Sequence, residues 1–304
     1  MKTESVVILL ATYNGGAYLS DFLDSLVKQT FADFKVLVRD DGSTDETLNI
    51  IQAYKGVLCI DVLNVSERLG PAMSFFELLR SAGDNFDYYF FADQDDSWHV
   101  EKIERAITAL AIEKETVALY CSRMDYVDEH LRHIKYSRIP RRLSFENALV
   151  ENIATGCTVA FNRNARQLVL TNLPNKVIMH DWWIYLVAIA FGKVIYDDFP
   201  TIKYRQHDSN VLGASTNLLQ DMQRKFARFV RKDGGVFSLT SQAEELMHCF
   251  SWRMSNQQLA SLSCLTNAKT ALFLRLKLAT NIAFFRQSRF DSIILKLLFI
   301  LGRF

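Results

Sequence analysis

Apolar and polar positions in the first third of the chain form blocks of two kinds. Short runs of Val, Ile, Leu and Phe without a charge are typical of strands buried on both faces, whereas apolar residues three or four positions apart predict amphipathic helices. The expected strands are residues 6–11, 34–39, 57–62 and 87–92. The expected helices are residues 17–30, a helix that starts within DDGSTDETLNII, and residues 72–80. Strands that alternate with helices predict βαβ units and a mostly parallel sheet.

The pattern is looser after residue 115. VALYCS and CTVAFN are expected to be strands, residues 181–191 a buried helix, and KVIYDD and TIKYRQH two further short strands. Beyond about Ala214 the chain has no proline and little strand signal, which predicts helices. We therefore expect an α/β domain over residues 1–215 and a helical region over residues 216–304.

Acidic residues cluster where the expected strands end. Asp40 and Asp41 follow the second strand, and Asp93, Asp95 and Asp96 follow the fourth. The turn TYNGG follows the first strand. Because parallel sheets bind ligands beyond the carboxyl ends of their strands, these segments are predicted to be neighbours around one ligand site.

The acidic cluster after the fourth strand has two interpretations. Carboxylate oxygens suit Mg²⁺ or Mn²⁺, which keeps open positions for phosphate oxygens and water. Asp93 and Asp95 can converge on one ion only if the chain leaves strand geometry there. Alternatively, the cluster is a solvated turn in which Asp96 or Ser97 caps the next helix. The second acidic pair at the same sheet edge favours the metal site.

Three other stretches also have two interpretations. DDGSTDET is either part of the ligand site or a turn in which Ser43 or Thr44 caps a helix with an acidic first turn. Asp181 lies in the apolar stretch MHDWW, where a lone carboxylate needs a partner or a chemical role unless it caps a helix. His207 in YRQHDSN is either a surface histidine or a ligand of a metal or a phosphate.

Composition narrows the class of protein. Hydrophobic residues make up 49% and charged residues 23% of 304 residues, which is typical of a globular protein. The formal net charge of +1 does not favour nucleic acid as a partner. Five cysteines without a CxxC motif predict reduced thiols in the cytoplasm rather than disulfides or a zinc site. No run of about 18 uncharged apolar residues occurs, so no membrane span is expected.

Basic and apolar residues are interleaved near the C-terminus. Residues 222–232 contain five basic residues and no acid, and residues 265–304 contain seven Lys or Arg against one Asp. This pattern predicts helices that lie on an anionic membrane surface. A helical bundle packed on the first domain, or a homodimer interface, would give the same pattern.

The order and spacing of the motifs resemble those of a known family. ATYNG, RDDGSTDET, FADQDDSW, TGCTVAFNR, MHDWW and YRQHDSNVLGA follow one another over about residues 1–215. Together they resemble the bacterial rhamnosyltransferases of glycosyltransferase family 2 that build O-antigens and streptococcal rhamnan polysaccharides. The resemblance implies a GT-A fold, which is a Rossmann-like α/β domain with a mostly parallel sheet flanked by helices, here with a C-terminal helical extension.

The resemblance also implies an activity and a location. The protein would be an inverting, metal-dependent glycosyltransferase that moves L-rhamnose from dTDP-L-rhamnose to a hydroxyl of a lipid-linked glycan acceptor. It would act in the cytoplasm, on the inner face of the bacterial plasma membrane. Two alternatives stay open: a hexosyltransferase of the same fold that uses a UDP-sugar, and a non-catalytic protein that binds sugar nucleotides or polysaccharides. A nucleotidyltransferase is disfavoured, because TYNGGAYLSD contains no basic residue for a triphosphate.

Residue roles follow from the resemblance by position. Asp95 would be the main ligand of Mg²⁺ or Mn²⁺, assisted by Asp93 and His207. The residues expected to contact the donor are Thr12, Tyr13, Asp40, Asp41, Arg68 and Asp93. Asp181 would be the catalytic base, and the residues expected on the acceptor side are Asp96, His180 and Trp182. Two positions depart from the family pattern: Arg68 replaces a frequent Asn, which could alter donor contacts, and Val100 replaces a frequent Pro.

Overall fold

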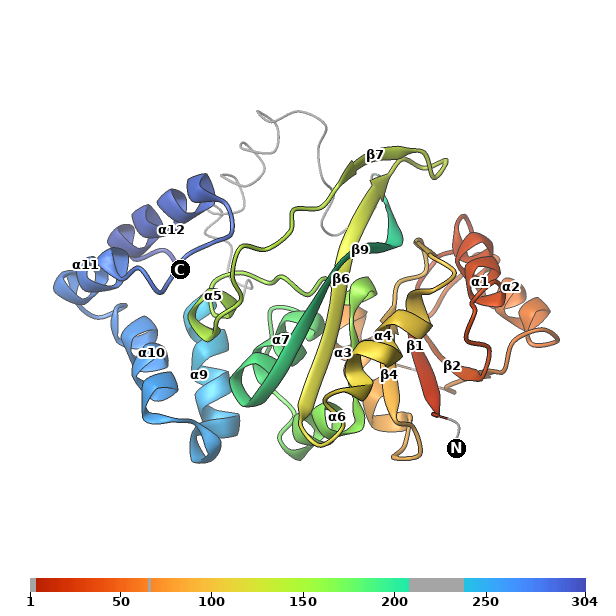
Figure 1. Cartoon of the computed structure of the whole chain (residues 1–304), viewed down its shortest axis with the longest axis horizontal. Coiled ribbons are helices and arrows are strands. Elements are labelled where there is room, and N and C mark those ends of the chain that lie inside the picture. The colour runs from red at the N-terminus through yellow and green to blue at the C-terminus, as the bar shows by residue number, and fades with distance from the viewer. Residues whose placement is uncertain (1–3, 65–66, 208–237) are drawn as a thin grey trace.

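The computed structural model describes residues 4–64, 67–207 and 238–304 (Figure 1). A single sheet with the strand order β3-β2-β1-β4-β8-β6-β9-β5 runs through its centre, and β7 pairs with β6. Helices flank the sheet, and the C-terminal helices gather at one end of the molecule, at the left of Figure 1. The α/β architecture matches the prediction.

The first half of the sheet is parallel. β1 (Val6–Thr12) lies between β2 (Phe34–Asp40) and β4 (Tyr88–Ala92), and β3 (Ile60–Val62) pairs with β2. The helices that connect these strands are α1 (Leu19–Val27), α2 (Thr47–Tyr54) and α3 (Gly70–Ser81). These are the predicted βαβ units. β3 is shorter than expected, because residues 55–59 form the turn that follows α2.

The second half of the sheet is mixed. β6 (Val117–Val127) pairs with β7 (His133–Tyr136) and β8 (Ala160–Asn162) in antiparallel fashion and with β9 (Gly192–Arg205) in parallel. The remaining elements of this half are β5 (Ser97–Trp98), α4 (Lys102–Ala111), α5 (Phe145–Ala148), the 3-10 turn η1 (Gly156–Thr158), α6 (Arg163–Thr171) and α7 (His180–Phe191). The prediction of two short strands in KVIYDD and TIKYRQH is wrong. β9 runs through both, because its register with β6 shifts near Pro200 without ending the pairing.

Neither of the two helix caps considered for the acidic turns is formed. Neither Ser43 nor Thr44 caps α2; instead, Asp45 Oδ1 accepts the N–H of Thr47 at 3.1 Å. Asp96 and Ser97 do not cap α4, which begins only at Lys102. Pairing of β5 with the end of β9 draws Ser97 into the sheet instead.

Apolar side chains pack on both faces of the sheet. Alternate residues of β1 point to opposite faces, so Val6, Ile8 and Leu10 join one core and Val7 and Leu9 join the other. The first core includes apolar side chains of α1 and α4, and the second includes those of α3, α6 and α7. Burial on both faces explains why this strand has no polar alternation.

The C-terminal region is helical, as predicted, wherever the structure describes it. Its elements are α9 (Leu239–Phe250), the 3-10 turn η2 (Ser251–Arg253), α10 (Asn256–Asn267), α11 (Leu272–Thr280) and α12 (Arg289–Leu301). Phe250, Leu265 and Phe299 are fully buried and belong to the same core as α7. The region is thus packed on the α/β domain. The basic stretch 222–232 lies outside the described residues, and within the described ranges no helix is long and apolar enough to cross a bilayer.

Candidate active site

The register of three parallel strands brings their following loops together. Thr12 at the end of β1 lies opposite Asp40 at the end of β2, and Leu10 lies opposite Ala92 at the end of β4. The residues that follow therefore emerge side by side at the carboxyl edge of the sheet. The predicted neighbourhood of TYNGG and the two acidic clusters is observed.

Gln94 ties the first loop to the acidic loop. The N–H of Tyr13 donates to Gln94 Oε1, and Gln94 Nε2 donates to the carbonyl of Tyr13, both at 2.9 Å. A Cβ on Gly15 would lie 2.2 Å from Gln94 Oε1, so this close approach requires a glycine. Gln94, which lies between Asp93 and Asp95 in the sequence, thus holds the acidic loop against the loop that follows β1.

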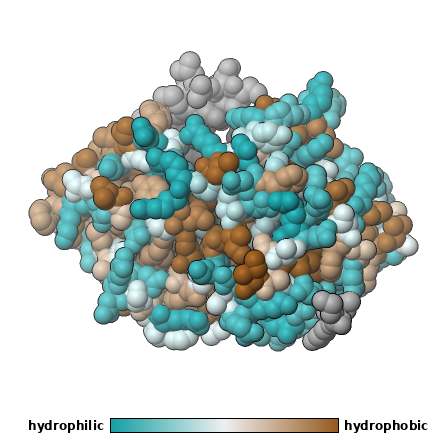
Figure 2. Space-filling view, viewed as in Figure 1, coloured by the Kyte–Doolittle hydropathy of each residue, from teal (hydrophilic) through white to brown (hydrophobic). Residues whose placement is uncertain are grey.

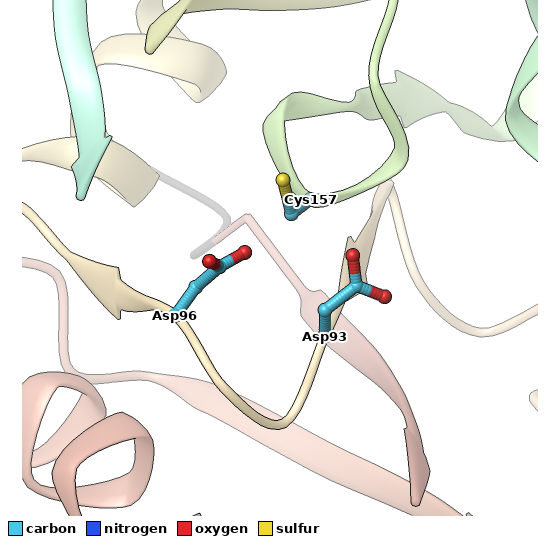
Figure 3. A group of neighbouring side chains, drawn as sticks. All are labelled: Asp93, Asp96 and Cys157. Atoms are coloured by element: carbon cyan, nitrogen blue, oxygen red, sulfur yellow. The ribbon is translucent and has the colours of Figure 1, made fainter. Parts of the chain in front are cut away.

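The acidic loop carries three carboxylates that gather near one thiol and one imidazole. Figure 3 shows Asp93 and Asp96 on either side of the loop, with Cys157 of η1 next to both. One ligand atom from each of these three residues lies within 4.8 Å of the others. Asp95 Oδ2 lies 2.8 Å from His207 Nε2. The structure therefore brings His207, which is distant in sequence, to the loop that carries Asp93 and Asp95.

Burial and mutual repulsion perturb these acids. Burial raises the pKa of Asp93, and the charges of Asp95 and Asp181 raise it further. Burial, Asp95 and Asp93 likewise raise the pKa of Asp96, which has no solvent exposure. Clustered acids of this kind favour a cation that compensates their charge, and carboxylate oxygens with one imidazole nitrogen suit Mn²⁺ or Mg²⁺. Burial raises the pKa of the Cys157 thiol and so disfavours the thiolate as a ligand.

Arg205 at the end of β9 fastens the acidic loop to the sheet. Its Nε donates to the carbonyl of Asp95 at 2.8 Å, and its N–H donates to Asp96 Oδ1 at 3.1 Å. The buried guanidinium also bonds the carbonyl of Glu129 and pairs with Asp21 at 2.7 Å. One side chain therefore satisfies several polar groups of the loop and its surroundings.

Replacement of Arg205 by Met should destabilise the protein. The carbonyls of Asp95 and Glu129 would lose their donor, so we expect the free energy of unfolding to fall by about 2–4 kcal/mol. Urea unfolding followed by circular dichroism measures this change. The control is Arg132→Met, which removes an exposed pair with Asp128 and should leave the midpoint nearly unchanged. An equal shift in both variants would contradict the assigned role.

Asp181 lies at the start of α7 and is joined to the acidic loop through η1. Its Oδ2 accepts the N–H of Gly156 at 2.8 Å, and its Oδ1 accepts the N–H of Trp182 at 2.7 Å. Gly156 is followed by Cys157, which lies next to Asp93 and Asp96. Asp181 does not cap the helix, because the N-cap is Met179. Burial raises the pKa of Asp181 to about 6, although these hydrogen bonds lower it.

The two neighbours of Asp181 are held firmly. His180 stacks on Phe75 with ring centroids 3.8 Å apart and meets Phe91 edge-on at 4.9 Å. Burial lowers the pKa of His180 to about 3, so the imidazole is neutral at physiological pH. Trp182 Nε1 donates to the carbonyl of Ala148 at 2.7 Å. These contacts fix the first turn of α7, and with it the carboxylate of Asp181.

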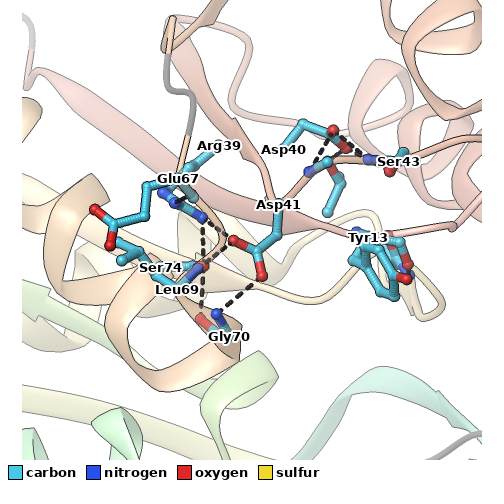
Figure 4. A network of polar contacts seen from close by, with 12 residues as sticks. Tyr13, Arg39, Asp40, Asp41, Ser43, Glu67, Leu69, Gly70 and Ser74 are labelled. Atoms are coloured by element: carbon cyan, nitrogen blue, oxygen red, sulfur yellow. Dashed lines mark hydrogen bonds and ion pairs between the residues drawn. The ribbon is translucent and has the colours of Figure 1, made fainter.

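Asp41 and Asp40 have different environments (Figure 4). Asp41 Oδ1 accepts bonds from Arg39 at 2.5 Å and from the N–H of Leu69 at 2.8 Å, and its Oδ2 accepts the N–H of Gly70 at 2.9 Å. Although burial raises the pKa of Asp41, these bonds hold it below its usual value. Asp40 instead closes its own turn, since it accepts bonds from the side chain and N–H of Ser43.

Thr12 and Arg68 complete this end of the site. The hydroxyl of Thr12 donates to Asp40 Oδ1 at 2.8 Å, and so links the ends of β1 and β2. The guanidinium of Arg68 lies 4.0 Å from the centroid of the Tyr13 ring, which is 41% exposed. An exposed aromatic ring with a cation on it is suited to stack against a planar ligand.

Several site residues carry no signal in the sequence. Gln94, Arg205 and Cys157 acquire their importance only from contacts with residues remote in the chain. Lys102 is fully buried near Asp96, and burial lowers its pKa to about 8. A basic residue at the start of an amphipathic helix reads as a surface position, so the sequence offered no reason to select it.

The acidic loop thus lies at the carboxyl edge of the parallel half of the sheet, and the buried Asp181 lies across η1 from it. Residues 7–172 match the family described as Glycosyl transferase family 2, and the chain belongs to this family. It is thus a glycosyltransferase, and the recognition from motif order is confirmed.

Individual relatives agree with this assignment. The dTDP-rhamnosyl transferase RfbG of Shigella flexneri is 29% identical over 234 residues, which cover 71% of this chain and 77% of the relative. Residues 1–349 of S. aureus TarS in complex with UDP-GlcNAc share the fold, with a TM-score of 0.59, 16% identity, and coverage of 98% of this chain and 91% of that chain. The mannosyltransferase PcManGT of Pyrobaculum calidifontis, in complex with GDP-Man and Mn²⁺, gives a TM-score of 0.52, 18% identity and coverage of 98% and 85%.

Proposed function

We propose that the protein is an inverting, metal-dependent rhamnosyltransferase of bacterial cell-surface polysaccharide synthesis. It moves L-rhamnose from dTDP-L-rhamnose to a hydroxyl of a lipid-linked glycan at the inner face of the plasma membrane. The observation that carries the proposal is the link through Gly156 and Cys157 between the acid Asp181 and the loop of Asp93 and Asp95. This link holds a base close to the loop that would bind the metal ion of the donor diphosphate, as a displacement at a sugar carbon requires.

The donor would lie against the loops after β1, β2 and β4. Tyr13 stacks on the nucleobase while Arg68 supports the ring from the other side. Among the described residues, Asp41 Oδ2 accepts one hydrogen bond, from the N–H of Gly70, so it retains an acceptor position for the imide N–H of a pyrimidine. Thr12 and Asp40 hold this loop in shape through their mutual hydrogen bond.

Asp95, Asp93 and His207 would hold Mg²⁺ or Mn²⁺. When bound, such an ion stabilises the negative charge of a departing nucleoside diphosphate. Arg205 and Gln94 keep the acidic loop in the position in which its carboxylates would bind the ion. A preorganised loop avoids the reorganisation that free carboxylates would need.

Asp181 would take the proton of the acceptor hydroxyl. Two backbone N–H groups orient its carboxylate, and a pKa near 6 leaves it deprotonated at neutral pH yet more basic than an exposed aspartate. His180 and Asp96 are both buried, so their part on the acceptor side would be to position Asp181 and the acidic loop. Trp182 is only partly buried, and its ring is available to an acceptor sugar.

The choice of rhamnose rests on the relative named a dTDP-rhamnosyl transferase. A UDP-hexose is the second candidate donor, because another relative, from Escherichia coli, is named a UDP-Glc-dependent glucosyltransferase and is 25% identical over 231 residues. A screen of purified nucleotide sugars with Mn²⁺ and a synthetic lipid-linked acceptor separates the two. Transfer from dTDP-L-rhamnose supports the proposal. Transfer from UDP-glucose alone would contradict the proposed donor and leave the proposed mechanism unchanged.

The nucleobase pocket makes a separate prediction. Because Asp41 is assigned to the imide N–H of a pyrimidine and Tyr13 to the face of its ring, dTDP and UDP should compete with the donor better than GDP by roughly tenfold or more. Inhibition constants measured at one metal concentration give the comparison. Inhibition by GDP equal to that by dTDP would show that the pocket does not read a pyrimidine.

A further inference from the structure

Helices α11 and α12 are apolar on two sides. Their inward side chains, such as Leu278, Leu295 and Phe299, are buried in the core. Their outward side is also apolar, and six of its residues are between 45% and 73% exposed: Leu272, Phe273, Leu276, Phe290, Ile293 and Leu297. Figure 2 shows brown residues beside teal ones over these helices, at the left end of the molecule. Water-exposed apolar residues that line up at helical spacing mark a contact surface.

A basic loop from a distant part of the sequence borders this apolar face. Residues 138–142, with the sequence RIPRR, expose Arg138, Arg141 and Arg142. The N–H of Arg141 donates to Gln287 Oε1 at 2.8 Å, and Gln287 Nε2 donates to the carbonyl of Arg142 at 2.7 Å. These bonds fix the loop against the segment that joins α11 to α12. Loop 138–142 with its three arginines thus lies beside the basic C-terminal helices, a proximity that the sequence pattern did not predict.

We infer that the outward side of α11 and α12, together with loop 138–142, is a docking surface for an anionic phospholipid bilayer. Leu, Ile and Phe side chains enter the boundary between head groups and acyl chains, and the arginines meet lipid phosphates. Exposed basic residues in the two helices and just after α12, namely Lys277, Arg289 and Arg303, extend the same charge. A bilayer with acidic lipids offers both an apolar interior and anionic phosphates. It therefore matches both the apolar side of the helices and the basic loop.

A second copy of the chain fits this surface less well. A two-fold interface would place the same positive residues of both copies opposite one another, which costs electrostatic energy. Residues 265–304 supply one Asp against seven Lys or Arg, so few acids are available to neutralise them. A bilayer containing acidic lipid has no such conflict.

The inference deepens the proposed function, since a lipid-linked acceptor would lie in the same bilayer and the bound enzyme would meet it in two dimensions. Vesicle binding itself requires neither donor nor turnover. Failure of binding would therefore leave transfer to a soluble acceptor untouched, and failure of transfer would leave binding untouched. The proposed function and the proposed docking surface can therefore be contradicted independently of each other.

The test is co-sedimentation of the full chain with vesicles made of equal parts phosphatidylcholine and phosphatidylglycerol, and with vesicles of phosphatidylcholine alone. The charge variant is Arg141→Gln with Arg142→Gln, and the apolar variant is Phe273→Ser with Leu297→Ser. All four side chains are exposed, so the core is preserved. The matched control is Lys55→Gln with Val57→Ser, an exposed basic and apolar pair beyond α2 at the opposite end of Figure 1.

The full chain should sediment with the anionic vesicles and more weakly with the neutral ones. The charge variant should lose roughly fivefold in affinity per arginine on anionic vesicles only, since each basic residue near the surface contributes about 1 kcal/mol. The apolar variant should lose affinity for both kinds of vesicle, and the control variant for neither. High salt should weaken binding of the full chain without abolishing it, because apolar burial is not screened.

A measurement on the unaltered chain guards against variants that fold poorly. Hydrogen exchange followed by mass spectrometry should slow in residues 138–142 and 289–301 when anionic vesicles are added, and not in residues 55–59. A full chain that stays in the supernatant with anionic vesicles would overturn the inference. So would a dimer in sedimentation equilibrium that Phe273→Ser with Leu297→Ser dissociates, because the face would then belong to a second copy.

Discussion

Replacement of Asp181 by Asn should lower the rate of sugar transfer by about 10²–10⁴-fold, the usual contribution of general-base catalysis. The amide cannot take a proton from the acceptor hydroxyl. The affinity for dTDP should change little, because Asp181 is assigned to the acceptor hydroxyl rather than to the nucleotide. Initial rates with saturating donor, together with calorimetric titration of dTDP, measure the two effects separately.

The pH profile of the unaltered enzyme provides a second readout of the same role. The pKa of Asp181 is raised to about 6 by burial, and the base acts in its deprotonated form. The rate should therefore fall as the pH drops through about 6 and reach a plateau above it. In the Asp181→Asn variant this step should disappear from whatever activity remains.

The Asp181→Asn variant needs a control for changes in folding, because the substitution alters the hydrogen bonds of the side chain. The amide offers one acceptor, so its NH₂ would face the N–H of Gly156 or Trp182 where a carboxylate oxygen now accepts. Thermal unfolding should show a folded protein with a lower midpoint. Asp198→Asn on the exposed side of β9 is the matched variant and should keep full activity. Loss of dTDP binding with retained turnover in Asp181→Asn would contradict the assignment.

Removal of divalent cations should abolish transfer by the unaltered enzyme. The acids of the loop repel one another, and a developing diphosphate would add charge beside them, so without a cation the leaving group lacks compensation. We expect a fall of roughly 10³-fold in excess EDTA, equivalent to about 4 kcal/mol of transition-state stabilisation, and recovery on addition of Mn²⁺ or Mg²⁺. Coupled detection of released nucleoside diphosphate measures both steps.

Asp95→Ala should reproduce this loss and resist rescue. It removes one carboxylate and the partner of His207, whereas the loop keeps the contacts of Arg205 with the backbone carbonyl of residue 95. The matched control is Asp33→Ala, an exposed acid just before β2, which should leave the metal response unchanged. Full turnover in excess EDTA would defeat the metal assignment.

The sequence predicted the parallel half of the sheet well because local and tertiary signals agree there. Val6 to Leu10 are apolar without alternation, and the structure buries them on both faces. The strand β9 was predicted less well, since Asp197 and Pro200 read as a break between two strands. In the fold, a shift of register against β6 accommodates both, which no local pattern reveals.

The site was predictable where its residues follow strand ends. His207 lies against Asp95, and the acids could be selected because charges that follow a buried strand need a compensating partner. The supporting contacts could not be selected. Arg205 and Gln94 act through backbone groups of remote loops, and Asp41 shares its carboxylate with Arg39 inside the protein. The sequence left open the alternative in which Asp96 or Ser97 caps a helix, because the pairing between β5 and β9 has no local signal.

The measurement that tests the central claim most directly is the anomeric configuration of the product, determined by NMR after transfer from dTDP-L-rhamnose to a lipid-linked acceptor. A single base on the acceptor side, Asp181, opposite a loop that neutralises the leaving diphosphate, predicts one displacement. The configuration at the anomeric carbon of the product should therefore be opposite to that of the donor. Retention of the donor configuration, or undiminished transfer by Asp181→Asn in the same assay, would contradict the account.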